Sequence, residues 1–247
     1  MDADQPLEPL ERAAAGIGAL ADPVRHQLYR YVCSQPAAVS REQAAEAVGI
    51  PHHQAKFHLD RLTAEGLLDS DYARLTGRSG PGAGRPAKLY RRADHDIAVS
   101  LPQREYELAG RLMAAAIARS AGTGEPVVDV LNQLAREYGQ AIGATAGTPH
   151  DPAAALVLAL GVLRRYGYEP RGADGEIELA NCPFHALAQE QTELACNMNH
   201  ALITGVADAL APHGPATRLQ PGPARCCVVL KCSNGPANSA RPSTSPR

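Results

Sequence analysis

Three short helix-like segments follow one another between Asp22 and Gly66, with turn residues between them. The first of them, residues 22–33, opens with an Asp-Pro pair, which suits the cap and the first position of a helix. Its apolar residues then recur at helical spacing. The pattern predicts a helix over residues 22–33.

The second and third segments are joined by a tight turn. Ser40 precedes REQAAEAV, and Gln43 three residues later gives the spacing of a capping box. Gly49 ends this segment, an Ile-Pro pair forms the turn, and a third helix, HHQAKFHLDRLTAE, runs up to Gly66. Two short helices joined by a Gly-containing turn predict a helix-turn-helix, whose second helix enters the major groove of DNA.

The third helix is expected to bury one side and to expose the other. Phe57, Leu59 and Leu62 are predicted as the buried side, with His58 packed among them. The polar residues remain for the outside, and we expect them to contact DNA; they are His52, His53, Gln54, Lys56 and Arg61.

A basic hairpin is predicted directly after the third helix. Two strand-like pieces, around residues 67–72 and 88–90, flank the Gly- and Arg-rich loop TGRSGPGAGRPA. The stretch from Tyr72 to Arg92 holds no Asp or Glu, and its cations suit contact with DNA phosphates. The expected phosphate contacts are Arg74, Arg78, Arg85 and Lys88, and Arg91 and Arg92 add to the charge of the same hairpin.

The composition is that of a folded chain and does not by itself indicate a nucleic-acid partner. The 247 residues allow one large domain or two small ones, and 45% of them are apolar. With two Phe, eight Tyr and no Trp, the core must consist mainly of Ala, Leu and Val. The formal net charge of −2 does not exclude DNA binding, because a DNA reader needs only a local basic face.

We expect a cytoplasmic protein without a membrane partner. The N-terminus is acidic and lacks the pattern of a signal peptide, and the longest apolar run, residues 153–163, is too short to cross a bilayer. In a reducing compartment, clustered thiols more often bind metals or carry out redox chemistry than form disulfides. The chain has six Cys, at positions 33, 182, 196, 226, 227 and 232.

The expected fold class is α+β, mainly α, with four segments along the chain. Residues 1–95 form a winged helix-turn-helix, 96–147 a helical connector, 148–232 an α+β sensor domain, and 233–247 a disordered tail. Within the connector, residues 101–119 predict a helix with a broad apolar face. That face either packs on its own domain or joins two copies into a homodimer, which would match a two-fold symmetric operator.

Geometry decides whether the C-terminal thiols can meet. If residues 184–195 formed one straight helix, Cys182 and Cys196 would be held roughly 18 Å apart. The helix must therefore break near Gln191-Thr192, where Thr192 is expected to cap a second helix. Cys226 and Cys227 are expected on a strand, where they would face opposite sides, and Cys226 is the favoured member of a cluster.

The sequence also resembles a known family. The stretches ALADPVRHQLYRYV, KFHLDRLTAEGLL and GRPAKLYRR, within residues 15–95, are similar to ArsR-like winged-helix proteins, and more closely to their SufR-type branch of iron–sulfur-responsive repressors. The resemblance implies a homodimeric repressor that binds an operator in double-stranded DNA. It also places Cys182 (within Asn181-Cys182-Pro183-Phe184), Cys196 and Cys226 at the positions of the family's iron–sulfur ligands.

Several alternatives stay open for the thiols. The fourth ligand could be His185, His200, Cys227 or Cys232. Zinc could replace a cluster, or the thiols could be inert and buried, with a small organic molecule as the effector. A thiol-dependent enzyme would need a Cys–His pair, for which Cys182 and His185 are the one local candidate. No nucleotide-binding Gly loop supports catalysis, and we expect no enzyme.

Overall fold

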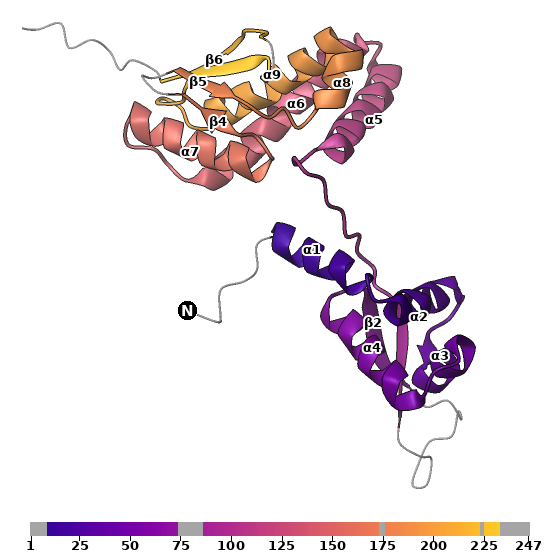
Figure 1. Cartoon of the computed structure of the whole chain (residues 1–247). Coiled ribbons are helices and arrows are strands. Elements are labelled where there is room, and N and C mark those ends of the chain that lie inside the picture. Colours follow the sequence, from indigo (N-terminus) through magenta and orange to yellow (C-terminus); the bar gives the residue numbers. More distant parts are fainter. Residues whose placement is uncertain (1–8, 74–85, 173–175, 223–224, 233–247) are drawn as a thin grey trace, which may run out of the picture. The chain divides into compact units, whose positions relative to one another are not determined.

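The chain divides between Val99 and Ser100 into two units (Figure 1). The computed structural model describes residues 9–73, 86–172, 176–222 and 225–232. Helices dominate both units, and each unit holds one small sheet, which confirms the α+β, mainly α, fold class. Among the described residues, no helix is long and apolar enough to span a membrane.

The first unit contains the predicted helix-turn-helix. Asp22 accepts a hydrogen bond from the backbone N–H of Arg25 (2.9 Å), and Ser40 and Gln43 form the predicted capping box. Gly49 ends the middle helix with a positive φ of 73°, a backbone conformation that costs glycine least. The elements are α1 (Pro9–Ala19), α2 (Pro23–Ser34), β1 (Val39–Ser40), α3 (Arg41–Val48), α4 (His52–Ala64), β2 (Leu68–Ala73) and β3 (Ala87–Arg92).

The predicted hairpin is present as the antiparallel pair β2–β3. Its register runs from Leu68 opposite Arg92 to Ala73 opposite Ala87, and β1 pairs with the other edge of β3. We call this hairpin the wing. Residues 74–85, which carry Arg74, Arg78 and Arg85, lie outside the described residues.

The buried side of α4 differs from the prediction at one residue. Ala55, His58, Leu59 and Leu62 are buried, whereas the Phe57 side chain is 63% exposed, so the prediction that Phe57 is buried was wrong. On a helix, residues two positions apart do not share a face. Phe57 lies two positions from both Ala55 and Leu59, and it therefore faces away from the core.

The second unit combines helices with a four-stranded antiparallel sheet in the order β4-β5-β7-β6. The helix α9 packs along this sheet and against α6 and α7 (Figure 1). The elements are α5 (Tyr106–Thr123), α6 (Val127–Gly143), a 3-10 turn η1 (Ala144–Ala146), α7 (Pro152–Arg165), β4 (Pro170–Arg171), β5 (Glu176–Leu179), α8 (His185–Glu190), α9 (Thr192–Asp208), β6 (Ala216–Leu219) and β7 (Val228–Lys231).

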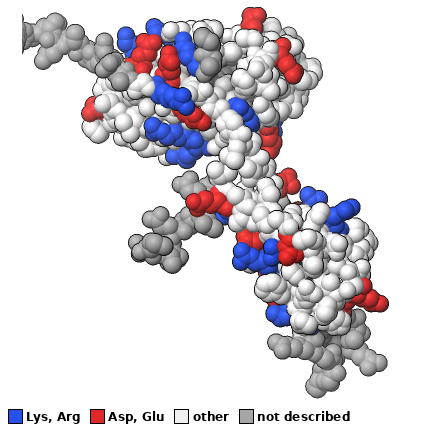
Figure 2. Space-filling view, viewed as in Figure 1, with Lys and Arg blue, Asp and Glu red and all other residues white. Residues whose placement is uncertain are grey.

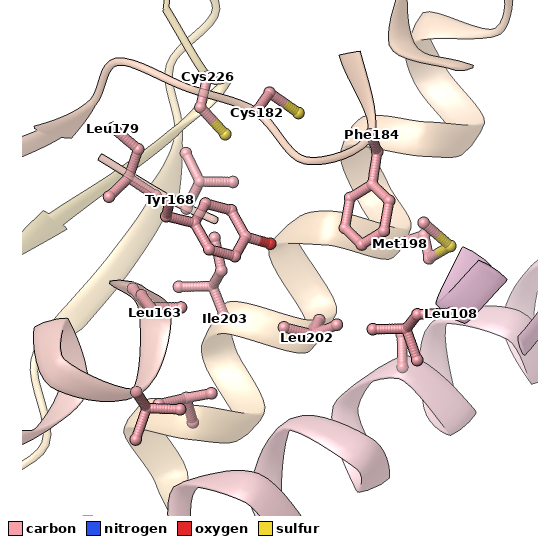
Figure 3. Close-up of a cluster of buried hydrophobic side chains, with 14 of the residues drawn as sticks. Leu108, Leu163, Tyr168, Leu179, Cys182, Phe184, Met198, Leu202, Ile203 and Cys226 are labelled. Atoms are coloured by element: carbon pink, nitrogen blue, oxygen red, sulfur yellow. The ribbon is translucent and has the colours of Figure 1, made fainter. Parts of the chain in front are cut away.

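One apolar core runs through this whole unit. It joins Leu108 of α5 to Leu163 of α7, Leu202 of α9 and Leu230 of β7. The segments expected as a connector (96–147) and as a sensor domain (148–232) thus share a core. Figure 3 shows Cys182 and Cys226 beside Tyr168 in this cluster of buried side chains.

Glycines allow α6 and α9 to approach closely. A Cβ atom on Gly139 of α6 would overlap the carbonyl oxygen of Leu202, and one on Gly205 of α9 would overlap that of Arg136. The two backbones are therefore in direct contact at these positions, and a larger residue has no room there.

The predicted apolar face of α5 is only partly covered. Leu108, Ala109, Leu112 and Ala116 are buried in the unit's own core, whereas the Ile117 side chain is 62% exposed. Own-domain packing accounts for the buried residues, and Ile117 lies outside it.

Candidate nucleic-acid interface and cysteine pocket

The predicted DNA-contacting residues of α4 reach the surface. His52, His53, Lys56 and Arg61 are exposed and Gln54 is partly exposed, because the apolar residues of α4 occupy its opposite side. Pro51 precedes the helix and leaves its first N–H groups without a side-chain cap. These free donors and the positive end of the helix dipole favour an anion at this end.

Asp60 connects α4 to the wing. Its carboxylate accepts hydrogen bonds from Lys56 Nζ (2.8 Å), from Lys88 Nζ (2.7 Å) and from the hydroxyl of Tyr90 (3.1 Å). Partial burial acts to raise the pKa of Asp60, but these hydrogen bonds outweigh it and lower the pKa to about 2. Asp60 therefore stays charged and ties β3 to α4.

Several basic side chains of the first unit are paired with acidic ones. Arg91 forms ion pairs with Asp69 (3.3 Å) and Asp71 on the neighbouring strand, and Arg61 forms one with Glu65 (2.6 Å). Figure 2 shows Lys and Arg side chains next to Asp and Glu in both units. The sequence analysis counted the cations of 72–92 and missed these partners, because the acidic residues lie just outside that stretch.

Four cysteines meet in the second unit. Cys182 follows β5, Cys196 lies on α9, and Cys226 and Cys227 immediately precede β7. As the sequence required, the helix breaks at Gln191, between α8 and α9, so Cys196 can approach Cys182. Thr192 does not cap α9, since its hydroxyl donates to the carbonyl oxygen of Ala188 (2.7 Å).

Cys227 joins the group, contrary to the expected alternation along a strand. The strand β7 begins at Val228, so Cys226 and Cys227 lie in the preceding turn and need not face opposite sides. Cys227 is buried, and its thiol forms hydrogen bonds with both Cys226 and Cys196.

Cys226 is the acceptor at the centre of the group. Hydrogen bonds from the thiols of Cys182 and Cys227 lower the pKa of Cys226, and the same bonds raise the pKa of the two donors. The side-chain amide of Asn199 also donates to Cys226 Sγ (3.1 Å). Tyr168, fully buried, donates to the carbonyl oxygen of Asn199 and so holds this amide in place.

A cavity of about 380 Å³, which we call the cysteine pocket, opens beside this group. Cys182, Cys196 and Cys227 line it together with His185, Arg104 and Arg225. Arg104 Nη1 donates to the Asn181 side-chain oxygen (2.7 Å) and to the Cys182 carbonyl oxygen (2.6 Å). Two arginines therefore bring positive charge to a pocket lined by thiols.

The remaining candidate ligands occupy other places. His200 lies 3.3 Å (Nε2–Oγ1) from the hydroxyl of Thr217 and lines a second, separate cavity with residues of α6. Cys232 follows the far end of β7, roughly 16 Å along the strand from Cys227. His185 borders the cysteine pocket, but the Cys182 thiol is bonded to Cys226, so the two do not form the Cys–His pair that a thiol enzyme requires.

The thiols are held by bonds to one another and not in a metal-binding arrangement. Within the described ranges, no three His, Cys, Asp or Glu side chains are placed so as to hold a metal ion. The donor chemistry nevertheless suits a soft metal centre, because thiolates are the ligands that iron–sulfur clusters and zinc share. Binding would require the thiols to turn from one another towards the pocket.

Comparison with known proteins identifies the first unit. A family model described as a helix-turn-helix domain matches residues 20–71, which span α2, α3 and α4 and most of β2. No curated protein matches the chain. The match agrees with the order of the helices and with the exposed polar side of α4. The chain therefore carries a winged helix-turn-helix of the kind that binds DNA in transcription regulators.

Proposed function

We propose that the protein is a homodimeric, SufR-type repressor whose C-terminal unit binds an iron–sulfur cluster through Cys182, Cys196, Cys226 and Cys227. The observation that carries the proposal is the convergence of these four thiols from three separate segments, in a chain that also holds a helix-turn-helix. Cys227 takes the place of the fourth ligand that the sequence left open.

The surroundings of the thiols support an anionic centre. Arg104 and Arg225 line the pocket, and their charges favour thiolates over thiols. Asn199 supplies an N–H donor to the sulfur of Cys226, a contact of the kind that tunes the potential of iron–sulfur centres. When bound, the cluster would supply a redox-active, oxygen-sensitive centre.

Dimer formation is proposed for the exposed side of α5. Ala114, Ile117, Ala118 and Ala121 follow helical spacing and are all exposed. In Figure 2 the surface over α5 is largely free of charged side chains. Two copies joined there would present two DNA-binding units to a palindromic operator. A cluster would regulate binding only if it favours one arrangement of the dimer over another.

The test is the colour and metal content of protein purified without oxygen. The wild-type protein should be brown and contain iron and acid-labile sulfide, and Cys182→Ser should lose the colour while its circular dichroism stays unchanged. Cys33→Ser, a thiol on α2 of the other unit, is the matched control and should keep the colour. Colourless protein without iron would contradict the cluster.

A second candidate effector is a small organic molecule. A cavity of about 380 Å³ falls within the size range of ligand pockets, which begins at about 300 Å³. In that case the protein would be colourless, Cys182→Ser would have no effect on DNA binding, and a metabolite extract would shift the thermal midpoint of the wild-type protein.

A further inference from the structure

Phe57 stands on the surface of the helix that is proposed to read DNA. Its side chain is 63% exposed, whereas the only other Phe of the chain, Phe184, is 1% exposed in the core of the second unit. Exposure of one aromatic residue is common in proteins and by itself means little. The position of Phe57 on α4 is the more informative observation.

Phe57 lies in a row with two polar, exposed residues. His53 precedes it by four positions and Arg61 follows it by four, so the three side chains lie one above the other along one side of the helix. Lys56, also exposed, is its neighbour in sequence. The buried residues Ala55, Leu59 and Leu62 occupy the opposite side.

The charge of this row fits DNA better than it fits an apolar protein partner. Arg61 and Lys56 are cationic, and the uncapped start of α4 adds free N–H donors, as expected for a surface that meets phosphates and base edges. A benzyl side chain between them can neither donate nor accept a hydrogen bond. In the major groove it matches one group, the C5-methyl of thymine, which is the apolar feature of that groove.

We propose that Phe57 is a specificity-determining residue that reads a thymine methyl group in each half of the operator. The inference rests on the proposed function, since it requires α4 to lie in the major groove. It adds the chemical identity of one base that this helix recognises. His53 and Arg61, on either side of Phe57, would contact the neighbouring base pairs or phosphates.

The experiment replaces thymine by deoxyuridine, which removes the methyl group and nothing else. Duplexes bound by the wild-type protein are first selected from a random pool, and each thymine of a half-site is then replaced singly by deoxyuridine. One position should lower affinity about fourfold, the factor that corresponds to about 0.8 kcal/mol for one buried methyl group. Phe57→Ala should bind the two duplexes equally.

Two control variants separate the methyl contact from general binding. Phe57→Leu keeps an apolar side chain and should keep discrimination between thymine and deoxyuridine. Lys56→Ala should weaken binding to both duplexes and leave their ratio unchanged. Because Phe57 is exposed, Phe57→Ala should unfold at the wild-type temperature, so a loss of discrimination cannot come from misfolding.

The contrary outcomes fall into distinct classes. If the wild-type protein binds no duplex, the proposed DNA-binding function fails and the inference fails with it. If the protein binds DNA but Phe57→Ala still distinguishes thymine from deoxyuridine, or no position responds to deoxyuridine, only the inference is overturned. Dissociation of a dimer by Phe57→Ala would also overturn it, because Phe57 would then be a protein contact.

Discussion

A single carboxylate determines how α4 and the wing are joined. Asp60 takes hydrogen bonds from Lys56 on its own helix and from Lys88 and Tyr90 on β3, which lies 28 and 30 residues later in the chain. These contacts lower the pKa of Asp60 to about 2, against an ordinary value of 3.8. They also compensate part of the positive charge that the sequence assigned to DNA binding.

Asp60→Asn should therefore reduce stability in a pH-dependent way. Because the pKa is lower in the folded state, the stabilisation is complete above about pH 4 and is lost as the pH falls towards 2. At pH 7 we expect a loss of about 1 kcal/mol in the free energy of unfolding, since Asp60 is one-third exposed and solvent screens its ion pairs.

Urea unfolding at several pH values measures this effect. The difference between the wild-type protein and Asp60→Asn should shrink as the pH falls from 4 to 2. Glu46→Gln, an exposed carboxylate on α3, is the control and should leave the free energy of unfolding at pH 7 nearly unchanged. A constant difference between pH 7 and pH 2 would show that the Asp60 charge is not the cause.

At the scale of elements, the contact between α6 and α9 positions the cysteines. Cys196 and Asn199 lie on α9, and α9 is held against α6 where Gly139 and Gly205 bring the backbones together. A shift of α9 would move Cys196 and Asn199 relative to Cys226. The close packing of two helices therefore supports the geometry of the cysteine pocket.

Gly139→Ala and Gly205→Ala should each destabilise the second unit by about 1–3 kcal/mol, because an added Cβ would overlap a carbonyl oxygen. Gly161→Ala on α7, where a Cβ meets nothing within 4 Å, should instead stabilise by up to about 1 kcal/mol through helix propensity. Thermal and denaturant unfolding compare the three. Equal effects at all three positions would argue against a close α6–α9 contact.

At the scale of the whole molecule, the proposed function depends on two copies acting together. Ile117 of α5 and Val157 of α7 are exposed to a similar degree, 62% and 67%. Only Ile117 belongs to the exposed apolar row that we propose as the interface. The pair therefore distinguishes a specific contact from general surface hydrophobicity.

Ile117→Asp should convert the protein to a monomer, because a charge buried in an apolar interface is costly. The affinity for a palindromic operator should then fall by about a hundredfold, the lower end of the gain from joining two binding modules. Val157→Asp should remain a dimer with unchanged affinity. Sedimentation velocity and gel retardation provide the two readouts. A dimeric Ile117→Asp protein would place the interface elsewhere.

Local sequence patterns determined much of this protein. The caps at Asp22 and Ser40, the Gly49 turn and the two strands of the wing follow from interactions between residues close in the chain, and all are present. The break at Gln191 was predictable too, because helix geometry allows Cys182 and Cys196 to meet in no other way. Asp22 and Ser40 act on N–H groups three residues away, so no distant contact is needed.

Tertiary structure alone decided the rest. It places Phe57 on the outer side of α4, starts β7 one residue after Cys227, and brings Asp60 to Lys88 and Asn199 to Cys226. These pairs are separated by 27 residues or more, and which side chains meet depends on how whole helices and strands pack. Periodicity marks which side of a helix can be buried, but only packing against a neighbour determines which residues at its border are covered.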